Sequence, residues 1–561
     1  MDEVRTRWYK DAFIYQIYPR SFCDSNGDGI GDIRGIISKL DYLKELGVNA
    51  VWLSPCYKSP NDDNGYDISD YKDIMDEFGT LDDWKEMVKG LHERGIKLIM
   101  DLVVNHSSDE HFWFQEAQKG KDNPYRDYYI WAKGKGKNGK KPPNNWTSRF
   151  GGSAWEYDEA SREYYLHLFT KKQPDLNWDN PKVRQEVQDI VRYWLDLGCD
   201  GFRCDVITYI SKREGLPDGK FAIGIVGDEH FTHGPHIHEY LNELNTKVLS
   251  KYDCMTVGEA AGVTIEQAQL YTDESRNELD TVFEFEHAEL DTFFKILPRK
   301  LSIPKLKGIF AKWQLGLRDK GWNSLYYENH DQPRSLGRYT GDYGPFRTQA
   351  AKMLAMSIYM QQGTPYVYQG QEIGMTNYPF RNLDDFKDVL VSYVRKTLGV
   401  LEPLLRGLIL KVLLKRARDH ARTPMQWSSK KHAGFSTAEP WIKINPNYAD
   451  INVESELANP DSILNFYKKI IAFRKNNDII KYGTYKENHS ASKDIYCYER
   501  WWHGEKLFVI CNFKNKHVKF GLPKDTAYEI CELKLHNYGY DRPTLTATTL
   551  RPYEAMVYYI K

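Results

Sequence analysis

The sequence predicts an α/β protein: a (β/α)8 TIM barrel with an inserted subdomain after the third strand and a C-terminal antiparallel β-domain. Three observations support this fold class. Up to about residue 375, short apolar runs rich in β-branched and aromatic residues alternate with helical stretches, which is typical of parallel βαβ units. A long polar and aromatic excursion interrupts this rhythm at 105–174. After residue 482 the pattern changes to short alternating strands.

Each barrel strand is expected where an apolar run follows a helical stretch. The eight candidate strands lie at 12–19, 48–54, 96–104, 201–207, 255–259, 280–285, 322–328 and 364–369. The barrel domain is then expected to span 1–104 and 175–481, with a helical excursion at about 376–430. Residues 105–174 form the inserted subdomain, and 482–561 are expected to fold as a C-terminal β-sandwich.

Composition and charge exclude several classes of partner. The 561 residues carry a formal net charge of -1, so neither nucleic acid nor an anionic membrane is an expected partner. The first residues carry no apolar signal segment, and no apolar run is long enough to span a bilayer. The eight cysteines are scattered and suit reduced, buried thiols. The sequence therefore predicts a cytoplasmic protein, which we expect to be a monomer.

Acidic side chains lie at the ends of several expected strands. Asp205 lies in the fourth strand, Glu259 ends the fifth, and Asp331 follows the seventh. Because the carboxyl ends of barrel strands meet at one face, these three carboxylates are expected to share a pocket. An isolated acidic residue at a strand end is more often a helix cap or part of an ion pair. Repetition at the same end of several strands favours a reactive site, because burying carboxylates together is costly.

Paired carboxylates are what the cleavage of a glycosidic bond requires. One acts as nucleophile or base, and the other acts as an acid with a raised pKa. Arg203 lies two positions before Asp205, so both side chains share one face of the strand, and the guanidinium would keep Asp205 ionised. Glu259 lies in an apolar run beside Gly258 and Ala260, an environment that would keep it protonated.

The strand-end segments resemble the conserved regions of the α-amylase superfamily, glycoside hydrolase family 13, and in particular its oligo-1,6-glucosidase, dextran glucosidase and sucrose isomerase group. The resemblance runs along nearly the whole chain and includes Gln-Pro-Asp-Leu-Asn-Trp at 173–178 and Gln-Gly-Gln-Glu-Ile-Gly-Met-Thr-Asn at 369–377. It implies that Asp205 is the nucleophile, Glu259 the acid/base, and Asp331 a third carboxylate that grips the sugar hydroxyls.

The resemblance also implies which residues contact the sugar. Tyr66 corresponds to a stacking ring, Asp67 to the carboxylate that holds the terminal sugar, and Arg422 to the arginine that joins this grip. An Asp–Arg pair that closes the pocket behind the last sugar would make the enzyme exo-acting. The implied substrate-binding residues are Tyr66, Asp67, His106, Phe169, Gln173, Arg203, His330 and Arg422.

Val206 bears on the bond that is cleaved. In the group that the chain resembles, valine after the nucleophile accompanies activity on α-1,6 bonds, and threonine accompanies an α-1,4 preference. The alternative for Val206 is ordinary strand packing. The sequence therefore predicts an exo-acting retaining α-glucosidase for isomaltose-like sugars, with a small oligosaccharide as its partner. Sucrose isomerase, α-1,4-glucosidase, dextran glucosidase and trehalose-6-phosphate hydrolase remain alternatives. A purely binding role is disfavoured because all three carboxylates are retained.

A short loop near the N-terminus places oxygen ligands at alternate positions, as in the first part of an EF-hand loop. The bidentate Glu at the end of that loop is missing, and Gly35 occupies its place. The alternative is a hydrogen-bonded turn without metal. Because the group that the chain resembles has a cation here, we expect a structural Ca2+, or Mg2+, and no organic cofactor. The expected ligands are Asp24, Asn26, Asp28, the Ile30 carbonyl and Asp32.

The segment 389–414 is more aliphatic than an exposed helical excursion requires, and relatives in the resembling group usually carry more polar residues there. We expect it to be buried against the barrel. The alternative is a surface for a partner.

Overall fold

The computed structural model describes residues 7–222, 224–293, 297–341, 344–523, 529–539 and 545–561. Residues 1–5, where no signal segment is expected, lie outside the described residues. All eight strands expected for the barrel form, and all except β10 are shorter than expected. They are β1 (Ile14–Ile17), β2 (Ala50–Leu53), β5 (Lys97–Leu102), β9 (Gly201–Cys204), β10 (Met255–Glu259), β11 (Thr281–Phe283), β14 (Ser324–Leu325) and β15 (Thr364–Tyr368).

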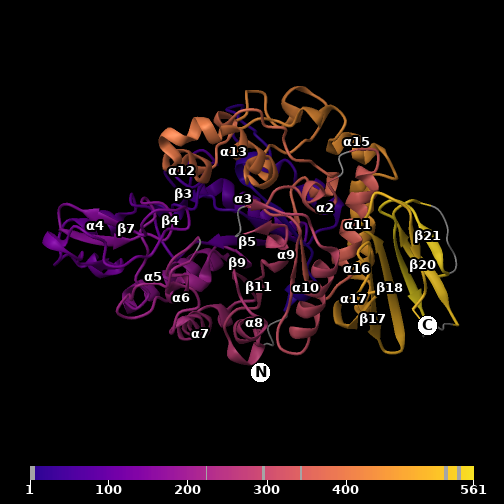
Figure 1. Cartoon of the computed structure of the whole chain (residues 1–561), viewed down its shortest axis with the longest axis horizontal. Coiled ribbons are helices and arrows are strands. Elements are labelled where there is room, and N and C mark those ends of the chain that lie inside the picture. The colour runs from indigo at the N-terminus through magenta and orange to yellow at the C-terminus, as the bar shows by residue number, and fades with distance from the viewer. Residues whose placement is uncertain (1–6, 223, 294–296, 342–343, 524–528, 540–544) are drawn as a thin grey trace.

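These eight strands form one parallel sheet in the order β11-β10-β9-β5-β2-β1-β15-β14. A parallel bridge between Val282 and Asn323 joins the two edges, so the sheet closes into the expected barrel (Figure 1). At least one helix follows each strand, and one of them lies shortly before the next barrel strand or, after β15, before the C-terminal part. These helices are α2 (Leu40–Leu46), α3 (Leu81–Glu93), α5 (Pro181–Asp196), α7 (Ile237–Lys247), α8 (Ile265–Thr272), α10 (Ile303–Gly316), α11 (Arg347–Tyr359) and α16 (Ile463–Lys475).

Local sequence explains where the barrel helices begin. The Thr80 side chain accepts a hydrogen bond from the Asp83 N–H, and the Asp83 side chain accepts one from the Thr80 N–H. These two bonds form a capping box for α3. Asn180 caps α5, and Pro181 occupies its first position, where no N–H is needed. These caps fix the loops that run from each strand end to the next helix.

Aromatic side chains fill the barrel. The Trp52 ring lies 5.6 Å from that of Phe283, which lies 4.7 Å from that of Tyr366. All three are buried in one cluster with Val257. The Trp52 indole N–H donates to Asp101 at 2.8 Å. The interior is therefore a packed core, and the polar residues at the strand ends rest on it.

The inserted excursion between β5 and α5 contains α4 (Phe112–Gln118) and a small antiparallel sheet. Its strands β6 (Trp131–Ala132), β7 (Trp155–Asp158) and β8 (Glu163–Leu166) lie in the order β6-β8-β7. In Figure 1 this part projects at the left of the barrel. Trp146 packs with Phe231, which lies in the connection after β9, so the insertion is anchored beside the strand end that carries Asp205.

The C-terminal part is antiparallel, as expected. Strands β16 (Thr484–Asn488), β17 (Ile495–Trp502), β18 (Glu505–Asn512), β22 (Ala555–Ile560) and β20 (Cys531–His536) form one sheet in this order, and β19 (Val518–Phe520) pairs with β21 (Thr548–Leu550). Phe520 and Leu550 of the smaller ribbon share a buried cluster with Phe508 and Met556 of the larger sheet. This part lies at the right in Figure 1.

The excursion after β15 contains α12 (Val389–Leu398), α13 (Glu402–Arg416) and α14 (Asp419–Arg422), and α12 and α13 lie above the barrel in Figure 1. The expectation that the aliphatic segment is buried against the barrel is wrong for α13. Leu404 is 82% exposed and Leu408 is 60% exposed. Only the other side of α13 packs, on a small separate cluster that includes Phe380 and Val391.

The eight cysteines form no disulfide in the structure, and seven of them are buried. Among the described residues, no helix combines the length and the apolar character that a transmembrane span requires.

Candidate active site

Arg203 brings the two expected catalytic carboxylates together. Asp205 directly follows β9 and Glu259 is the last residue of β10. One terminal nitrogen of Arg203 lies 2.6 Å from Asp205 Oδ1, and the other lies 2.5 Å from Glu259 Oε2. The same guanidinium binds Asp101 of β5. The two carboxylates are therefore neighbours on one guanidinium, and a nucleophile and an acid acting on one bond must be neighbours.

Burial raises the pKa of both carboxylates of this pair. The side chains of Asp205 and Glu259 are 8% and 16% exposed. Burial raises the pKa of Asp205 to about 6 against the opposing charge of Arg203. Burial likewise raises the pKa of Glu259 to about 7, also against Arg203, and the neighbouring Asp205 and Asp331 add to the rise. The higher pKa therefore belongs to the residue expected to act as the acid.

The surroundings of Glu259 differ from the apolar ones expected from its neighbours in sequence. Its Oε2 accepts hydrogen bonds from Arg203 and from the Val206 N–H at 3.2 Å. Burial and nearby negative charge, not contact with apolar side chains alone, hold its proton. Periodicity along one strand could not reveal this, because the polar partners come from the neighbouring strand end.

Asp331 lies in a cationic setting. Its carboxylate is 3.2 Å from His330 Nε2, 2.9 Å from Arg422 and 3.2 Å from Arg418. Burial favours the neutral acid, but His330 and the two arginines outweigh it and hold the pKa of Asp331 well below its usual value. Asp331 is therefore ionised at every working pH. It is the most exposed of the three carboxylates, at 28%.

Tyr66 links the two halves of this cluster. Its hydroxyl lies 2.6 Å from His330 Nε2, and the two rings stack with centroids 5.4 Å apart. The Arg203 guanidinium lies 5.7 Å from the Tyr66 ring, and His106 Nε2 lies 3.2 Å from the Tyr66 carbonyl. Burial lowers the pKa of His106 to about 3, so this imidazole is neutral. Tyr66, His106, Arg203 and His330 thus form one contacting group.

Phe169 and Gln173, near the end of the inserted excursion, both contact His106. The Phe169 ring lies 5.0 Å from that of His106 and 5.7 Å from that of Phe150. The Gln173 amide lies 3.2 Å from His106 Nε2. The Arg418 guanidinium lies 5.7 Å from the Phe150 ring. Aromatic rings of the insertion therefore form a row of contacts from His106 to Arg418, which lies in the excursion after β15.

The two excursions also meet next to Phe150. Gly151 and Gly152 have φ of +99° and +76°, a backbone conformation that suits glycine. The ring of Tyr393 on α12 packs directly over both. A Cβ added at Gly151 would lie only 2.6 Å from Cε1 of Tyr393, so no larger residue fits beneath the ring.

Asp67 lies in a loop beside the cluster, and the same loop carries another carboxylate that no sequence motif singled out. Asp67 is fully buried, and its carboxylate accepts from Ser59 and from the Asp62 and Asp63 N–H groups at 2.8–3.0 Å. The expected pair between Asp67 and Arg422 does not form, since Arg422 pairs with Asp331 instead. Asp67 shapes the loop because hydrogen bonds within the loop occupy both of its oxygens.

Asp63 is the carboxylate that this loop presents to the site. Its Oδ2 accepts from Gln173 at 3.3 Å, Arg418 lies 3.6 Å from Oδ1, and Oδ1 is buried without a hydrogen-bond partner in the structure. Burial raises the pKa of Asp63 to about 7. Asp388 holds Arg418 through two bonds of 2.6 and 2.7 Å. The spacing of Arg418 and Arg422, one helical turn apart, is the sequence signal that could have revealed the second arginine.

The loop with the expected metal ligands forms a tight turn. Asp24 accepts from the N–H groups of Asn26, Gly27 and Gly29 at 2.7–2.9 Å. Asp32, also expected as a ligand, caps α1 (Ile33–Ile37) by accepting from the Gly35 N–H at 2.6 Å. No three His, Cys, Asp or Glu side chains gather as a metal cluster in the described part of the chain. The remaining oxygen donors are two carboxylates, an amide and the Ile30 carbonyl, which suit a hard cation that keeps bound water.

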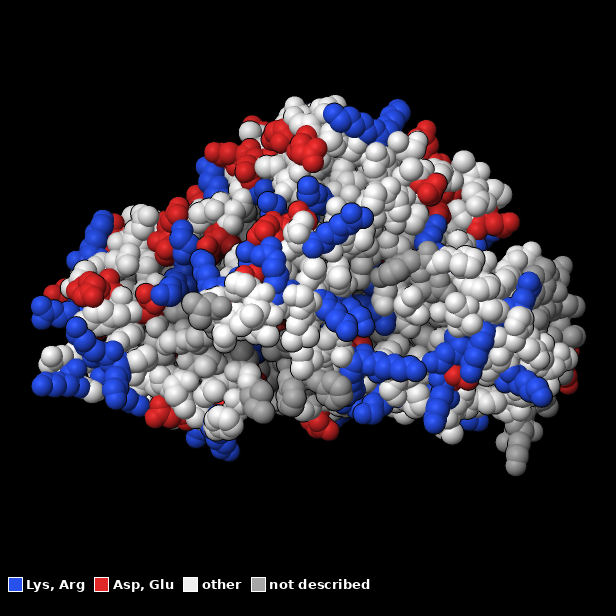
Figure 2. Space-filling model, turned by 45° about the horizontal axis from the view of Figure 1, so that its top comes forward, with Lys and Arg blue, Asp and Glu red and all other residues white. Residues whose placement is uncertain are grey.

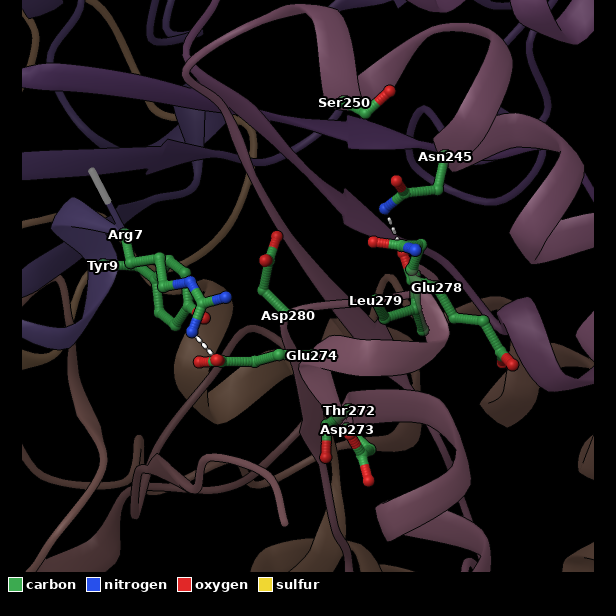
Figure 3. Close-up of a pocket in the computed structure, with 11 residues that line it drawn as sticks. Arg7, Tyr9, Asn245, Ser250, Thr272, Asp273, Glu274, Glu278, Leu279 and Asp280 are labelled. Atoms are coloured by element: carbon green, nitrogen blue, oxygen red, sulfur yellow. Dashed lines mark hydrogen bonds and ion pairs between the residues drawn. The ribbon is translucent and has the colours of Figure 1, made fainter. Parts of the chain in front are cut away.

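A cavity of about 180 Å3 (Figure 3) lies at the end of the barrel opposite the candidate active site. Asp280, which precedes β11, and Tyr9, which precedes β1, line it. Its groups are mutually paired: Arg7 with Glu274, and the Asn245 amide with the Glu278 carbonyl at 2.8 Å. Residues at this end of a barrel contribute to stability, not to chemistry.

The chain is similar in sequence and in fold to characterised glycoside hydrolases. The family model for the catalytic domain of alpha amylases matches residues 16–483. The oligo-1,6-glucosidase of Parageobacillus thermoglucosidasius is 56% identical over 566 residues and 99% of each chain, and that of Bacillus cereus is 54% identical over 564 residues and all of both chains. The crystal structure of trehalose-6-phosphate hydrolase from Bacillus licheniformis superposes with a TM-score of 0.94 at 46% identity, covering 99% of this chain and all of that one. The chain belongs to the α-amylase family of glycoside hydrolases.

Proposed function

We propose that the chain is an exo-acting, retaining α-glucosidase that releases terminal α-1,6-linked glucose from short oligosaccharides such as isomaltose. The observation that carries this proposal is the pair Asp205 and Glu259 on one guanidinium, with the higher pKa on Glu259. The oligo-1,6-glucosidases that match the full length of the chain support the same substrate class.

The proposed reaction proceeds in two displacements. Asp205 attacks the anomeric carbon while Glu259 gives its proton to the glycosidic oxygen, and the bonding pair leaves with that oxygen. A glucosyl ester of Asp205 remains. The Glu259 carboxylate then takes a proton from water, whose oxygen attacks the anomeric carbon and frees Asp205. Arg203, bound to both carboxylates, keeps their relative position through both steps.

The exo action follows from the closed end of the site. Asp63 and Asp331 offer carboxylate oxygens beside Arg418, and Arg422 fixes Asp331 from behind. Such an array binds the hydroxyls of one terminal glucose and leaves no path for a longer chain beyond it. We assign the grip on the terminal sugar to Asp63 and Asp331 rather than to Asp67.

The preference for α-1,6 bonds is assigned to Val206. Its φ of 34° is unusual for a β-branched residue, and its N–H binds Glu259. Its half-buried side chain packs with the apolar cluster of the insertion, and we propose that it borders the group that leaves.

A panel of initial rates on isomaltose, panose, maltose, sucrose and trehalose 6-phosphate tests the substrate class. We expect isomaltose and panose to be hydrolysed at least about tenfold faster than maltose, since apolar contacts in a pocket discriminate by this order. Fast cleavage of maltose with none of isomaltose would overturn the linkage preference. Isomaltulose as the main product from sucrose would reassign the chain to isomerisation, and preference for the phosphorylated disaccharide would reassign it to that substrate.

We also propose a structural Ca2+ or Mg2+ held by Asp24, Asn26, Asp28 and the Ile30 carbonyl. The exposed Asp28 has only Oδ1 bonded within the loop, to the Ile30 N–H at 2.8 Å. Chelation is expected to lower the melting temperature by about 3 °C or more, because a ligand that binds only the folded state stabilises it. Calorimetry with and without chelator, beside elemental analysis, measures this. Asp28→Asn is expected to lose the effect, and an unchanged melting temperature with a blank elemental analysis contradicts the site.

The compartment and assembly proposed for the chain are the cytosol and a monomer. Eight free cysteines suit a reducing compartment. Every group assigned to the reaction comes from one chain, so the site needs no second subunit to be complete.

A further inference from the structure

A groove of about 870 Å3 lies between the barrel, α13 and the C-terminal sheet. Its lining contains none of the three candidate catalytic carboxylates. Its lining combines Asp291 and residues within 298–303 before and at the start of α10, residues 337–341 after β14, the end of α13 and the turn after β18. Figure 2 shows that Lys and Arg side chains gather from the middle of the molecule toward the C-terminal sheet at its right. The volume falls within the range that holds one small molecule.

The lining of this groove, which we call the basic groove, is strongly cationic. A single carboxylate, Asp291, accompanies the cations. The six cationic side chains are Arg299, Lys300, Arg338, Lys415, Arg416 and Lys514. The chain as a whole carries a formal net charge of -1, so this excess of positive charge is a local property of the groove.

Asp291 is shared by two of these arginines. Its carboxylate lies 2.8 Å from Arg338 and 3.0 Å from Arg416. Burial, together with the charge of Arg338, lowers the pKa of Arg416 to about 10. The single carboxylate of Asp291 thus pairs with two guanidiniums, and the lining contains no second carboxylate among the residues that the structure describes.

The three lysines of the groove have weak partners or none in the part of the chain that the structure describes. Lys514 reaches Asp494 only at 4.0 Å, and burial followed by the charge of Lys300 lowers its pKa. Lys300 and Lys415 are exposed and have no hydrogen-bond or ion-pair partner within the described ranges of the chain. An anion in the groove would gain charge-assisted hydrogen bonds that these ammonium groups do not make in the structure.

We propose that the basic groove binds a phosphate monoester of a small molecule. The Arg416 guanidinium offers donors beyond its bond to Asp291, and the ammonium groups of Lys300 and Lys415 offer point charges, a combination that suits the three oxygens of a phosphate group. The half-enclosed shape and limited volume favour a single small ligand over a polymer, and the charge excludes a neutral sugar as the main determinant.

The basic groove is connected to the candidate active site through short covalent and hydrogen-bonded steps. Arg416 is two residues from Arg418, which binds Asp331. Arg338 donates to Gln332 Oε1 at 2.9 Å, and Gln332 is the next residue after Asp331. A ligand that repositions Arg338 or Arg416 therefore acts on the groups beside the terminal sugar. This effect rests on the proposed glucosidase function, whereas the binding itself does not.

Isothermal titration of the full chain with inorganic phosphate and with glucose 6-phosphate, at constant ionic strength in chloride, tests the site. We expect saturable binding at one site, weakened about tenfold or more in Lys300→Gln/Lys415→Gln. This variant is expected to fold, since neither lysine makes a contact that the fold needs. The control Lys182→Gln/Lys443→Gln removes two other exposed lysines and the same net charge, and it is expected to bind as the native chain does.

The outcomes separate the ligand sources and the two proposals. Tighter binding of glucose 6-phosphate than of phosphate assigns the site to a sugar phosphate, and equal binding assigns it to the phosphate group alone. No saturable heat, or equal loss in the control, overturns the basic groove as a site. The KM for isomaltose is expected to change about threefold or more with bound ligand. Binding without any change in KM refutes the coupling alone, and absence of activity on isomaltose refutes the proposed function and leaves the titration valid.

Discussion

Asp205→Asn is expected to lose roughly 10^4-fold or more in kcat on isomaltose. The amide has nearly the shape of the carboxylate and still accepts a hydrogen bond from Arg203, so the site remains assembled. It has no negative charge and cannot form the glucosyl ester, so the first displacement stops. Steady-state rates on isomaltose, with product quantified as glucose, measure the loss.

The fold of this variant is expected to survive. Burial raises the pKa of Asp205 to about 6, so the native carboxylate is ionised at neutral pH in a site that disfavours its charge. A neutral amide removes that cost, and the melting temperature should be equal to or higher than that of the native chain. Asp319→Asn makes the same chemical change at a side chain that is 87% exposed and should keep full activity. Residual activity of Asp205→Asn above roughly one per cent would assign the nucleophile to another residue.

Glu259→Gln is expected to lose roughly 10^3-fold or more on isomaltose and much less on 4-nitrophenyl α-glucoside. The sugar leaving group needs a proton from Glu259, whereas a nitrophenolate leaves without one. Azide should restore turnover on the activated substrate, because this anion attacks the glucosyl ester without a base. Glu266→Gln, on the exposed start of α8, is the matched control. Equal losses on both substrates, with no azide effect, contradict the acid/base role.

The pH profile gives a second readout of this pair. Asp205 must be ionised, so kcat/KM should fall below about pH 6. Glu259 must be protonated, so kcat/KM should also fall above about pH 7. The two groups titrate as a pair, so the profile reports their joint behaviour. In Glu259→Gln, assayed on the activated substrate, the alkaline limb should disappear while the acidic limb remains. An alkaline limb that persists assigns that titration to another group.

Sequence patterns predicted the barrel well because each strand is a continuous apolar run. They overestimated strand length: 322–328 was expected, and only Ser324–Leu325 pairs as β14. Tyr326 and Tyr327 extend the apolar run because they are buried in the core, although they lie beyond the paired residues. Apolar character reports burial, and strand length also needs partners for the backbone, which one sequence does not reveal.

The site was predictable where strands position it and less so where loops do. Arg203, Asp205 and Glu259 follow from their places at two strand ends. Asp63 and Asp67 lie four residues apart in one loop, and only the folded loop shows which carboxylate faces the site and which binds backbone N–H groups. The exposure of α13 was also out of reach, because an aliphatic helix has the same sequence signature whether both sides are covered or one.

The seat of Tyr393 over Gly151 and Gly152 ties α12 to the inserted excursion. Phe150, the residue before this glycine turn, contacts Phe169 and lies beside Arg418. Local unfolding of α12 would release the turn and the Phe150 ring, while the carboxylates stay on the rigid barrel. We therefore expect heating or mutation of this contact to change which sugars the protein accepts, independently of the speed at which an accepted bond is cut.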